Sequence, residues 1–351
     1  VNQNTVDTIN KGKIHIVEPE LDILVRSVIK TGHLRATTQP EKADVFMVAV
    51  PTPFKGENKP DLSYIESAAK SIAPVLKKGN IVILESTSPI GTTEKMVKWI
   101  KETRPDLTFP EFGADGIDTD ISVAHCPERV LPGHVIRELV ENDRIIGGVT
   151  EHCAERARSL YKIFVDADCL VTDCRTAELS KLVENSFRDV NIAFANELSF
   201  ICDKLNINVW DMIKLANRHP RVNILQPGPG VGGHCIAVDP WFIVDSAPNE
   251  AKLIRTARQV NDSKPFFVLE KISQAVANTE KKISELKIAC LGLSFKPNID
   301  DLRESPALKI AHQINSMNFS KQYLVEPNID KMPRGFDLEC TELLDLKMAL
   351  E

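Results

Sequence analysis

Residues 45–50 read VFMVAV, and residues 81–85 read IVILE. Each run is short, continuous and apolar, which is typical of a parallel strand that is buried on both faces. Between them, residues 63–78 have the apolar spacing of a helix, with Gly79 as its stop signal. Strands that alternate with helices in this way predict a doubly wound α/β sheet.

The predicted helix at 63–78 carries two local signals. Ser63 and Glu66 have the spacing of a capping box, so the helix is expected to begin with a serine cap. Pro74 has no N–H to donate and is expected to kink the helix. The same alternation predicts further elements: strands at 121–126 and 144–149 and a helix at 151–164.

The pattern changes at residue 176. Residues 176–205 form one long helical pattern without Gly or Pro, and a second long helix is expected at 250–278. Two long helices between α/β segments are typical of a spine that joins two domains, and often of a dimer interface. A second α/β unit is expected to follow, with these elements: strands at 286–291 and 322–325 and a helix at 305–316.

Composition narrows the class of protein. The chain has 351 residues, of which 43% are hydrophobic and 26% charged, as is ordinary for a soluble globular protein of two or more domains. Its net charge is −6, and it has no block of like charge and no apolar run of membrane-spanning length. Neither nucleic acid nor a membrane is therefore the expected partner. The cytoplasm is the expected compartment.

Metal binding is not indicated either. The eight cysteines form no CxxC pair, and no group of histidines has zinc-ligand spacing. Scattered cysteines of this kind are usually buried thiols, with one reactive exception at most.

The most specific segment is residues 226–240, QPGPGVGGHCIAVDP. Four glycines lie shortly before Cys235: Gly228, Gly230, Gly232 and Gly233. They permit positive φ and a close approach of backbone to a ligand, and successive N–H groups in such a loop can bind an anion. This pattern favours a cysteine presented to a ligand, with Asp239 available to orient a water or a lysine. A surface turn with an incidental cysteine is the alternative.

The helix at 176–205 carries a polar stripe. It consists of Glu178, Lys181, Asn185 and Arg188, at i, i+3, i+7 and i+10. These residues share one face, while apolar residues cover most of the other sides. A solvated stripe is one interpretation, but a largely buried helix with a single polar stripe favours a site.

Together these segments resemble the UDP-glucose/GDP-mannose dehydrogenase family over nearly the whole chain. The resemblance rests on long motifs in the family's order: VPTPFKG, ESTSPIGTTEK, CPERVLPG, TAELSKLVENSFRDVNIAFANEL, NRHPRVNILQPGPGVGGHCIAVDPWFIV and FKPNIDDLRESPA. It implies an α/β fold in three parts. These are an incomplete Rossmann-like NAD-binding domain at 1–172, a central long-helix dimerisation region with the catalytic loop at 173–282, and an incomplete C-terminal α/β nucleotide-sugar-binding domain at 283–351.

The resemblance also implies an activity. The protein is expected to use NAD in a four-electron oxidation of the C6 alcohol of a nucleotide sugar to the uronic acid. UDP-N-acetyl-D-mannosamine is the favoured substrate, with UDP-glucose and GDP-mannose as alternatives, and a homodimer through the central helices is the expected assembly. Cys235 is implied as the thiolate that adds to the aldehyde, giving a thiohemiacetal and then a thioester that water cleaves.

Other residues take their expected roles from the same resemblance. Lys181 and Asn185 polarise the substrate oxygen and hold the oxyanion. Asp239 and Glu128 serve the water step. The implied cofactor-binding residues are Pro51, Thr52, Pro53, Thr87 and Arg303, and Thr87 also lies near the reacting centre. The implied substrate-binding residues are Gly230, Gly232, Gly233, Lys296 and Arg221, the last of which reaches into a neighbouring subunit.

The sequence departs from the family pattern at both ends. The N-terminal GxGxxG fingerprint and the strand with the ribose-binding acid are absent, and residues 2–10 match the segment just after that strand. The chain is therefore expected to lack its first βαβ unit and the end of its C-terminal domain. No measurable NAD binding is expected for residues 1–351 alone.

Two alternatives of other classes stay open. One is an inactive fragment that only dimerises or binds nucleotide sugar. The other is a hydrolase that uses His234 and Cys235, although adjacent side chains diverge and rarely form such a pair.

Overall fold

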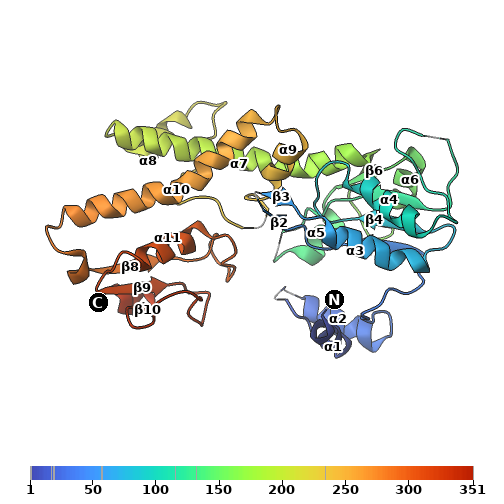
Figure 1. Ribbon diagram of the computed structural model, residues 1–351, viewed down its shortest axis with the longest axis horizontal. Helices are drawn as coiled ribbons and strands as arrows, with labels where there is room; N and C mark the ends of the chain where they lie inside the picture. The colour runs from blue at the N-terminus through green and yellow to red at the C-terminus, as the bar shows by residue number, and fades with distance from the viewer. Residues whose placement is uncertain are drawn as a thin grey trace. The chain divides into compact units, whose positions relative to one another are not determined.

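The computed structural model describes residues 2–16, 18, 20–56, 58–114, 116–131, 133–233 and 235–350. The chain divides into two compact units, Val1–Leu182 and Val183–Glu351 (Figure 1). The division into three domains stays a prediction. Within the described residues, no helix is long and apolar enough to cross a membrane.

The first unit is built on a five-stranded sheet. In spatial order its strands are β1 (Val45–Val48), β4 (Ile81–Leu84), β5 (Ser122–His125), β6 (Arg144–Gly148) and β7 (Cys169–Asp173). β1, β4 and β5 are parallel, with Val45 opposite Ile81 and Ile81 opposite Ser122. The strands predicted around residues 45, 81, 121 and 144 are thus confirmed, within one or two residues at their ends.

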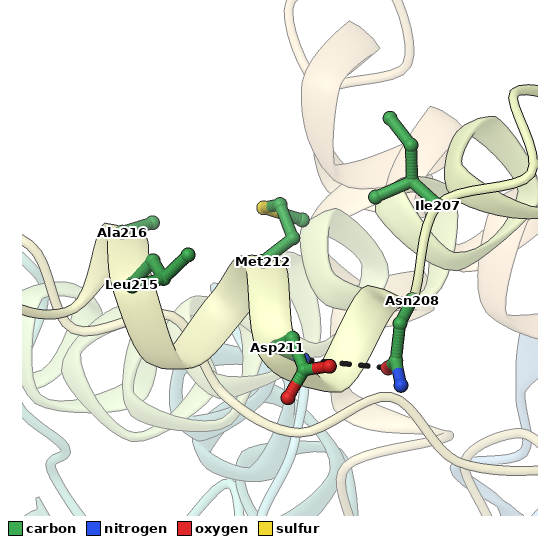
Figure 2. Close-up of a pocket in the computed structure, with 6 residues that line it drawn as sticks. All are labelled: Ile207, Asn208, Asp211, Met212, Leu215 and Ala216. Atoms are coloured by element: carbon green, nitrogen blue, oxygen red, sulfur yellow. Dashed lines mark hydrogen bonds between the residues drawn. The ribbon is translucent and has the colours of Figure 1, made fainter.

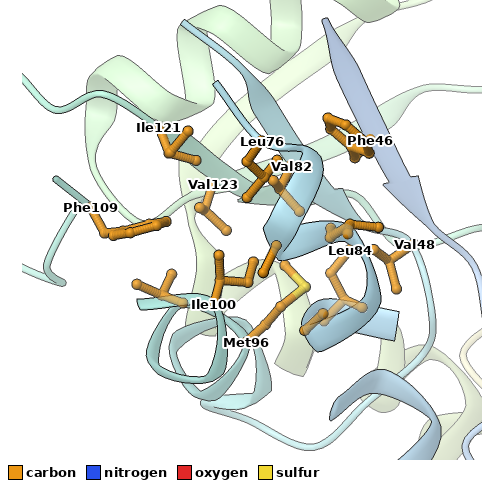
Figure 3. Close-up of a cluster of buried hydrophobic side chains, with 14 of the residues drawn as sticks. Phe46, Val48, Leu76, Val82, Leu84, Met96, Ile100, Phe109, Ile121 and Val123 are labelled. Atoms are coloured by element: carbon orange, nitrogen blue, oxygen red, sulfur yellow. The ribbon is translucent and has the colours of Figure 1, made fainter. Parts of the chain in front are cut away.

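Some of the helices of the first unit pack on the two faces of this sheet. The helical segments are α1 (Gln3–Asn10), α2 (Leu21–Lys30), α3 (Ser63–Ile72), η1 (Ala73–Val75), α4 (Thr92–Thr103), α5 (Val135–Glu141), α6 (Glu151–Tyr161) and the first part of α7 (Cys174–Lys204); β2 (Phe54–Lys55) and β3 (Lys59–Pro60) form a small hairpin. Figure 3 shows Val82 and Val123 of the sheet packed with Met96 and Ile100 of α4. On the other face, α6 packs Tyr161 against the sheet. The predicted helix at 151–164 is confirmed.

Two local predictions for the helix at 63–78 are wrong. Ser63 lies inside α3, whose N-cap is Leu62 without a side-chain bond; instead the N–H of Ser63 donates to Asp61 Oδ1 at 3.0 Å. An aspartate two residues before the first helical N–H already satisfies that donor, so no capping box forms. The α-helix ends at Ile72 and tightens into the 3₁₀ turn Ala73–Val75, so Pro74 terminates the α-helix rather than kinking it.

The sheet is also not parallel throughout. β6 runs antiparallel to β5, with Ala124 opposite Gly148, and β6 and β7 are parallel again. A parallel return needs a crossover element that packs on the sheet. The helix between β5 and β6, α5, has no buried residue and supplies no such crossover, so the chain turns back antiparallel.

The second unit contains the rest of α7 and a three-stranded parallel sheet. Its other elements are α8 (Val209–Ala216), α9 (Asp239–Ser246), α10 (Lys252–Ala277), η2 (Ile283–Glu285), β8 (Lys287–Leu291), α11 (Pro306–Asn315), β9 (Lys321–Val325), β10 (Thr341–Leu343) and α12 (Leu346–Leu350). The strand order is β10-β9-β8. The predicted long helices and the predicted strand–helix–strand unit after residue 286 are confirmed. Ile310 and Ile314 of α11 pack with Val268 and Ile272 of α10 in its core.

Candidate functional site

Cys235 lies in a turn that leads directly into α9. Its carbonyl oxygen accepts hydrogen bonds from the N–H groups of Val238, at 3.0 Å, and Asp239, at 2.9 Å. The residue is exposed, whereas most of the other cysteines are buried or half-buried. The turn therefore presents the Cys235 thiol at the surface of the second unit, next to the buried start of a helix.

The glycines before Cys235 allow the loop to lie against the segment 293–306. A Cβ on Gly232 would lie 2.7 Å from Phe295 Cβ and from the Glu304 carbonyl oxygen. Gly233 has φ +80°, and its N–H donates to the Arg303 carbonyl oxygen at 3.2 Å. The close approach that the glycine pattern predicts is thus an approach to the protein's own chain. Contacts of Gly230, Gly232 and Gly233 with substrate stay a prediction.

A fixed cation lies near the cysteine. The Arg303 guanidinium donates to both carboxylate oxygens of Asp301, at 2.9 Å from Nε to Oδ1 and 2.6 Å from Nη2 to Oδ2. Asp301 raises the pKa of Arg303, and the negative charge of a Cys235 thiolate raises it further. Such a neighbour favours the thiolate form that nucleophilic chemistry needs. Lys296, in the same segment, is exposed.

α7 brings a second predicted residue to the loop. Asn185 Nδ2 donates to Asp239 Oδ2 at 2.5 Å, and both residues are buried. Two residues that the resemblance assigned to the reaction are therefore in contact, although 54 positions separate them in the chain. An amide donor on the carboxylate fixes its orientation beside the turn that carries Cys235.

The rest of the polar stripe on α7 is mixed. Lys181 is half-buried and Arg188 is exposed. Glu178 is buried and accepts from the N–H groups of Gly91, at 2.6 Å, and Thr93, at 2.7 Å, at the start of α4. Glu178 thus caps a helix of the first unit. The interpretation as a wholly solvated stripe is wrong.

In the first unit, the turns after β1 and β4 are tied together. Thr52 Oγ1 donates to the Thr87 carbonyl oxygen at 2.6 Å, and Ser86 Oγ accepts from the Val50 N–H at 2.8 Å. Pro51 and Pro53 are exposed and Thr87 is half-exposed. The carboxyl ends of adjacent parallel strands are where open α/β sheets bind nucleotides. Contacts of Pro51, Thr52, Pro53 and Thr87 with NAD stay a prediction.

Glu128 follows β5 at the same carboxyl edge. Its Oε1 accepts from the N–H groups of Arg129, at 2.6 Å, and Val130, at 2.9 Å, and the buried Arg144 donates to its Oε2 at 3.2 Å. Nearby, the Tyr161 hydroxyl donates to Glu85 at 2.6 Å, and burial raises the pKa of Glu85. Arg144 was not predicted from the sequence, because its partner Glu128 lies in the loop that follows a different strand, β5.

Arg221 lies in an exposed turn. Asn217 closes this turn by donating to the Ile224 carbonyl oxygen at 2.9 Å and accepting from its N–H at 2.7 Å. The turn presents Arg221 away from the core of its own unit. His234 lies outside the described residues, so its pairing with Cys235 stays a prediction.

A hollow on the second unit is lined by other residues. It is an open depression on α8, lined by Ile207, Asn208, Asp211, Met212, Leu215 and Ala216 (Figure 2). Asn208 caps α8 through its side chain, which accepts from the Trp210 and Asp211 N–H groups. The lining is mostly apolar and includes none of the predicted catalytic residues, so it has the character of a contact surface.

The sequence analysis missed a group of buried polar residues between α7 and α10. They are Asp189, Asn196, Arg258 and Asn261. The signal was present, because Asp189 and Asn196 lie four and eleven positions after Asn185 and so extend its face of the helix. A polar residue that repeats on a buried face is the mark of a network rather than of solvation.

Known proteins are similar to this chain over nearly its whole length. The NAD-binding, central and UDP-binding domains of the UDP-glucose/GDP-mannose dehydrogenase family match residues 1–165, 175–263 and 289–351. A UDP-N-acetyl-D-mannosamine dehydrogenase from Campylobacter jejuni is 68% identical over 334 residues, covering 95% of this chain and 81% of that protein. An NDP-N-acetyl-D-galactosaminuronic acid dehydrogenase from Ralstonia nicotianae is 62% identical over 350 residues, covering 100% and 81%.

A solved structure supports the same relationship. The chain has a TM-score of 0.86 and 39% identity to a UDP-D-ManNAc dehydrogenase from Pyrococcus horikoshii, covering 98% of this chain and 82% of that one. The predicted family, the enzyme class and the cofactor NAD are thus confirmed. The chain belongs to the UDP-glucose/GDP-mannose dehydrogenase family, whose members are NAD-dependent oxidoreductases of nucleotide sugars.

Proposed function

We propose that this protein oxidises UDP-N-acetyl-D-mannosamine at C6 to the uronic acid, with two molecules of NAD consumed per sugar. The proposal rests on one observation above others. An exposed Cys235 lies in a turn that leads to the buried Asn185–Asp239 pair, and the positive charge of Arg303 acts on its thiolate. This is the arrangement that a covalent oxidation of an aldehyde needs. The Campylobacter jejuni relative carries the same substrate in its name.

The proposed chemistry passes through Cys235. NAD, when bound, accepts a hydride in each of the two oxidations. Lys181 and Asn185 donate hydrogen bonds to the substrate oxygen, where negative charge collects. The Cys235 thiolate adds to the C6 aldehyde and forms a C–S bond, giving a thiohemiacetal. Loss of hydride from that carbon leaves a thioester on Cys235.

Water completes the reaction. Asp239 and Glu128 serve this step: one carboxylate accepts a proton as water adds to the thioester carbonyl carbon, and the other accepts the second proton as the free carboxylate forms. The tetrahedral species collapses, the C–S bond breaks, and the Cys235 thiolate leaves as the free carboxylate forms. Arg303 stabilises the departing thiolate because it keeps a positive charge beside the sulfur.

The binding roles follow the same proposal. Pro51, Thr52, Pro53 and Thr87 line the nicotinamide side of the cofactor, since they form the tied turns at the carboxyl edge of the sheet. Arg303 also contacts the cofactor. The residues proposed to hold the substrate are Gly230, Gly232, Gly233, Lys296 and Arg221.

We further propose a homodimer through the central helices. On the second unit, Val183, Phe187, Phe194 and Ile201 of α7 are all exposed, Phe187 by 68%. An apolar strip of this length on one helix is expected to be covered by a partner. A second copy fits because Arg221 is presented in an exposed turn, ready to enter a neighbouring substrate site. The cytoplasm, which supplies both NAD and nucleotide sugars, is the proposed compartment.

The test of the activity is a substrate panel. Residues 1–351, purified together with an upstream segment that supplies the family's GxGxxG fingerprint, are given NAD with UDP-N-acetyl-D-mannosamine, UDP-N-acetyl-D-galactosamine, UDP-glucose or GDP-mannose, and NADH and sugar acid are measured. We expect two NADH per acid and the highest kcat/KM with the mannosamine sugar. The galactosamine sugar is included because a relative of 62% identity is named for its acid. A folded protein that binds these sugars but forms no NADH would instead favour nucleotide-sugar binding without turnover.

A further inference from the structure

A hydrogen-bond network of buried side chains extends from the core of the second unit to the Cys235 loop. Arg258 Nη1 donates to Asp189 Oδ1 at 2.5 Å, and Asn261 Nδ2 donates to the same oxygen at 2.8 Å. Asn196 Nδ2 donates to Asn261 Oδ1 at 2.9 Å. This network reaches the loop at Asn196, whose Oδ1 accepts from the Gly228 N–H at 2.9 Å.

Because these side chains are buried, the loss of any one hydrogen bond in the network is costly. Asp189 and Asn196 are 0% exposed, and Arg258 and Asn261 are 1% exposed. A buried amide that loses a partner retains the full cost of its desolvation, because no water replaces the lost bond. The state in which all these bonds exist together is therefore strongly favoured over states in which the loop has moved away from α7.

The helix sets where the two anchors of the loop lie. Asn185 binds Asp239 after Cys235, and Asn196 binds Gly228 before it. The two asparagines are eleven positions apart, just over three full turns, so both side chains leave the same face of α7. At 1.5 Å per residue the anchors are separated by roughly 16 Å along the helix. The segment that carries Cys235 is thus held at both ends by one rigid element.

We propose that Asn196 is a positioning residue for Cys235, acting through the Gly228 N–H, and that Asp189, Arg258 and Asn261 hold Asn196 in the orientation this requires. The inference deepens the proposed function, on which its catalytic readout rests. Asn196 touches neither the thiol nor a ligand in this arrangement. Its effect is on the turnover step, which depends on where the Cys235 sulfur lies relative to the reacting carbon.

The main test is Asn196→Leu, which preserves volume and removes both hydrogen bonds. We expect kcat to fall roughly ten- to hundredfold, the range for leaving buried groups without partners, while KM for NAD and for the sugar changes less than about threefold. Asn191→Leu is the matched control. Asn191 lies on the same helix, and among the described residues its side chain donates only to the Phe187 carbonyl oxygen, so near-normal kcat is expected.

Hydrogen exchange tests the same inference without substrate. In Asn196→Leu, amides of the peptide around residues 226–233 are expected to exchange at least about tenfold faster, because the Gly228 N–H has lost its acceptor. Exchange in β1, β4 and β5 of the first unit stays unchanged. Gly228→Ala retains the N–H, and its added Cβ meets nothing within 4 Å, so exchange at residues 226–233 should stay at the wild-type rate in this variant.

A second variant covers the case in which Asn196→Leu does not fold. Asn261→Ala leaves the acceptor for Gly228 in place but frees Asn196 to rotate, so a smaller fall in kcat and a smaller rise in loop exchange are expected. Wild-type exchange at 226–233 and wild-type kcat in these variants would overturn the inference. Faster loop exchange in a protein that oxidises none of the sugars would uphold the positioning geometry and reject the proposed function instead.

Discussion

The carboxyl edge of the first sheet and the Cys235 loop of the second unit hold their side chains in different ways. At the sheet edge, the turns after β1 and β4 are fixed by a strand ladder and by short bonds such as Thr52 to Thr87. The loop has no strand ladder; besides the backbone bond from Gly233 to Arg303, it is held by buried side chains such as Asn196 and Asn185. Several hydrogen bonds therefore hold each turn at the sheet edge, whereas the position of the loop relies on a few individual hydrogen bonds.

The largest expected effect lies in the loop, at the nucleophile itself. Cys235→Ala removes the atom that forms the covalent intermediate, so production of the sugar acid should fall to background in an assay of NADH and acid. Cys340→Ala is the control, because Cys340 is also exposed and lies outside the loop. It should retain nearly full activity. Acid formation at the wild-type rate by Cys235→Ala would remove the loop from the chemistry altogether.

The next effect concerns Lys181 on α7. Lys181→Ala should lower kcat by roughly two to three orders of magnitude, which is the usual result of losing one donor to a developing oxyanion. Lys204→Ala, at the exposed end of the same helix, should leave kcat within about twofold. Steady-state kinetics on both variants decides the matter. Equal, small effects would mean that Lys181 is an ordinary surface lysine.

A smaller effect is expected at the sheet edge. Thr52→Val removes the bond to the Thr87 carbonyl oxygen but preserves the shape of the side chain. Because Ser86 and the β1–β4 ladder still hold both turns, kcat/KM for NAD should fall less than about fivefold, the equivalent of one neutral hydrogen bond. A fall as large as that of Asn196→Leu would break the contrast between the two regions.

The two regions also differ in how well the sequence predicts them. The strands β1 and β4 are buried runs whose apolar pattern predicts them directly, and the long helix α10 has a sustained helical pattern. The direction of β6 has no such signal, because apolar patterning is the same for a parallel and an antiparallel strand. The short helix α9 was also not predicted, since DPWFIVDS is apolar on most sides and has little period.

Some residues of the candidate site can be predicted from the sequence, and others cannot. Cys235 and Asp239 stand out within one glycine-rich segment, and Asn185 belongs to a visible stripe on α7. Asn196 meets Gly228 across 32 residues and Asn261 across 65. No local pattern encodes such contacts, because they arise only when two helices pack together. The expected capping box at Ser63 failed for a related reason, since the neighbouring Asp61 competes for the same N–H.

The smallest expected effect is on stability rather than activity. Lys264 is 6% exposed, and its Nζ lies against the rings of both Phe200 and Phe267, at 4.7 and 4.4 Å from their centroids. Burial lowers its pKa to about 8, from 10.5 in the unfolded chain. Between these two pH values the unfolded chain binds more protons than the folded one, so this group makes the protein more stable as pH rises.

The comparison of wild type with Lys264→Met isolates that contribution. Over the pH range from 8 to 10.5, the free energy of unfolding of wild type should rise by roughly 1–3 kcal/mol relative to that of the variant. Urea unfolding of the second unit at several pH values measures it. A constant difference would show that Lys264 keeps its ordinary pKa.

The most direct test of the central claim is to trap the covalent intermediate. Glu128→Gln should slow the water step, so that the acyl group accumulates on the enzyme when NAD and UDP-N-acetyl-D-mannosamine are added. After an acid quench, peptide mass spectrometry should find the nucleotide-sugar acyl mass on the peptide that contains Cys235 and on no other. An acyl group on a different residue, or NADH and acid formed at full rate with Cys235 replaced by Ala, would contradict the account.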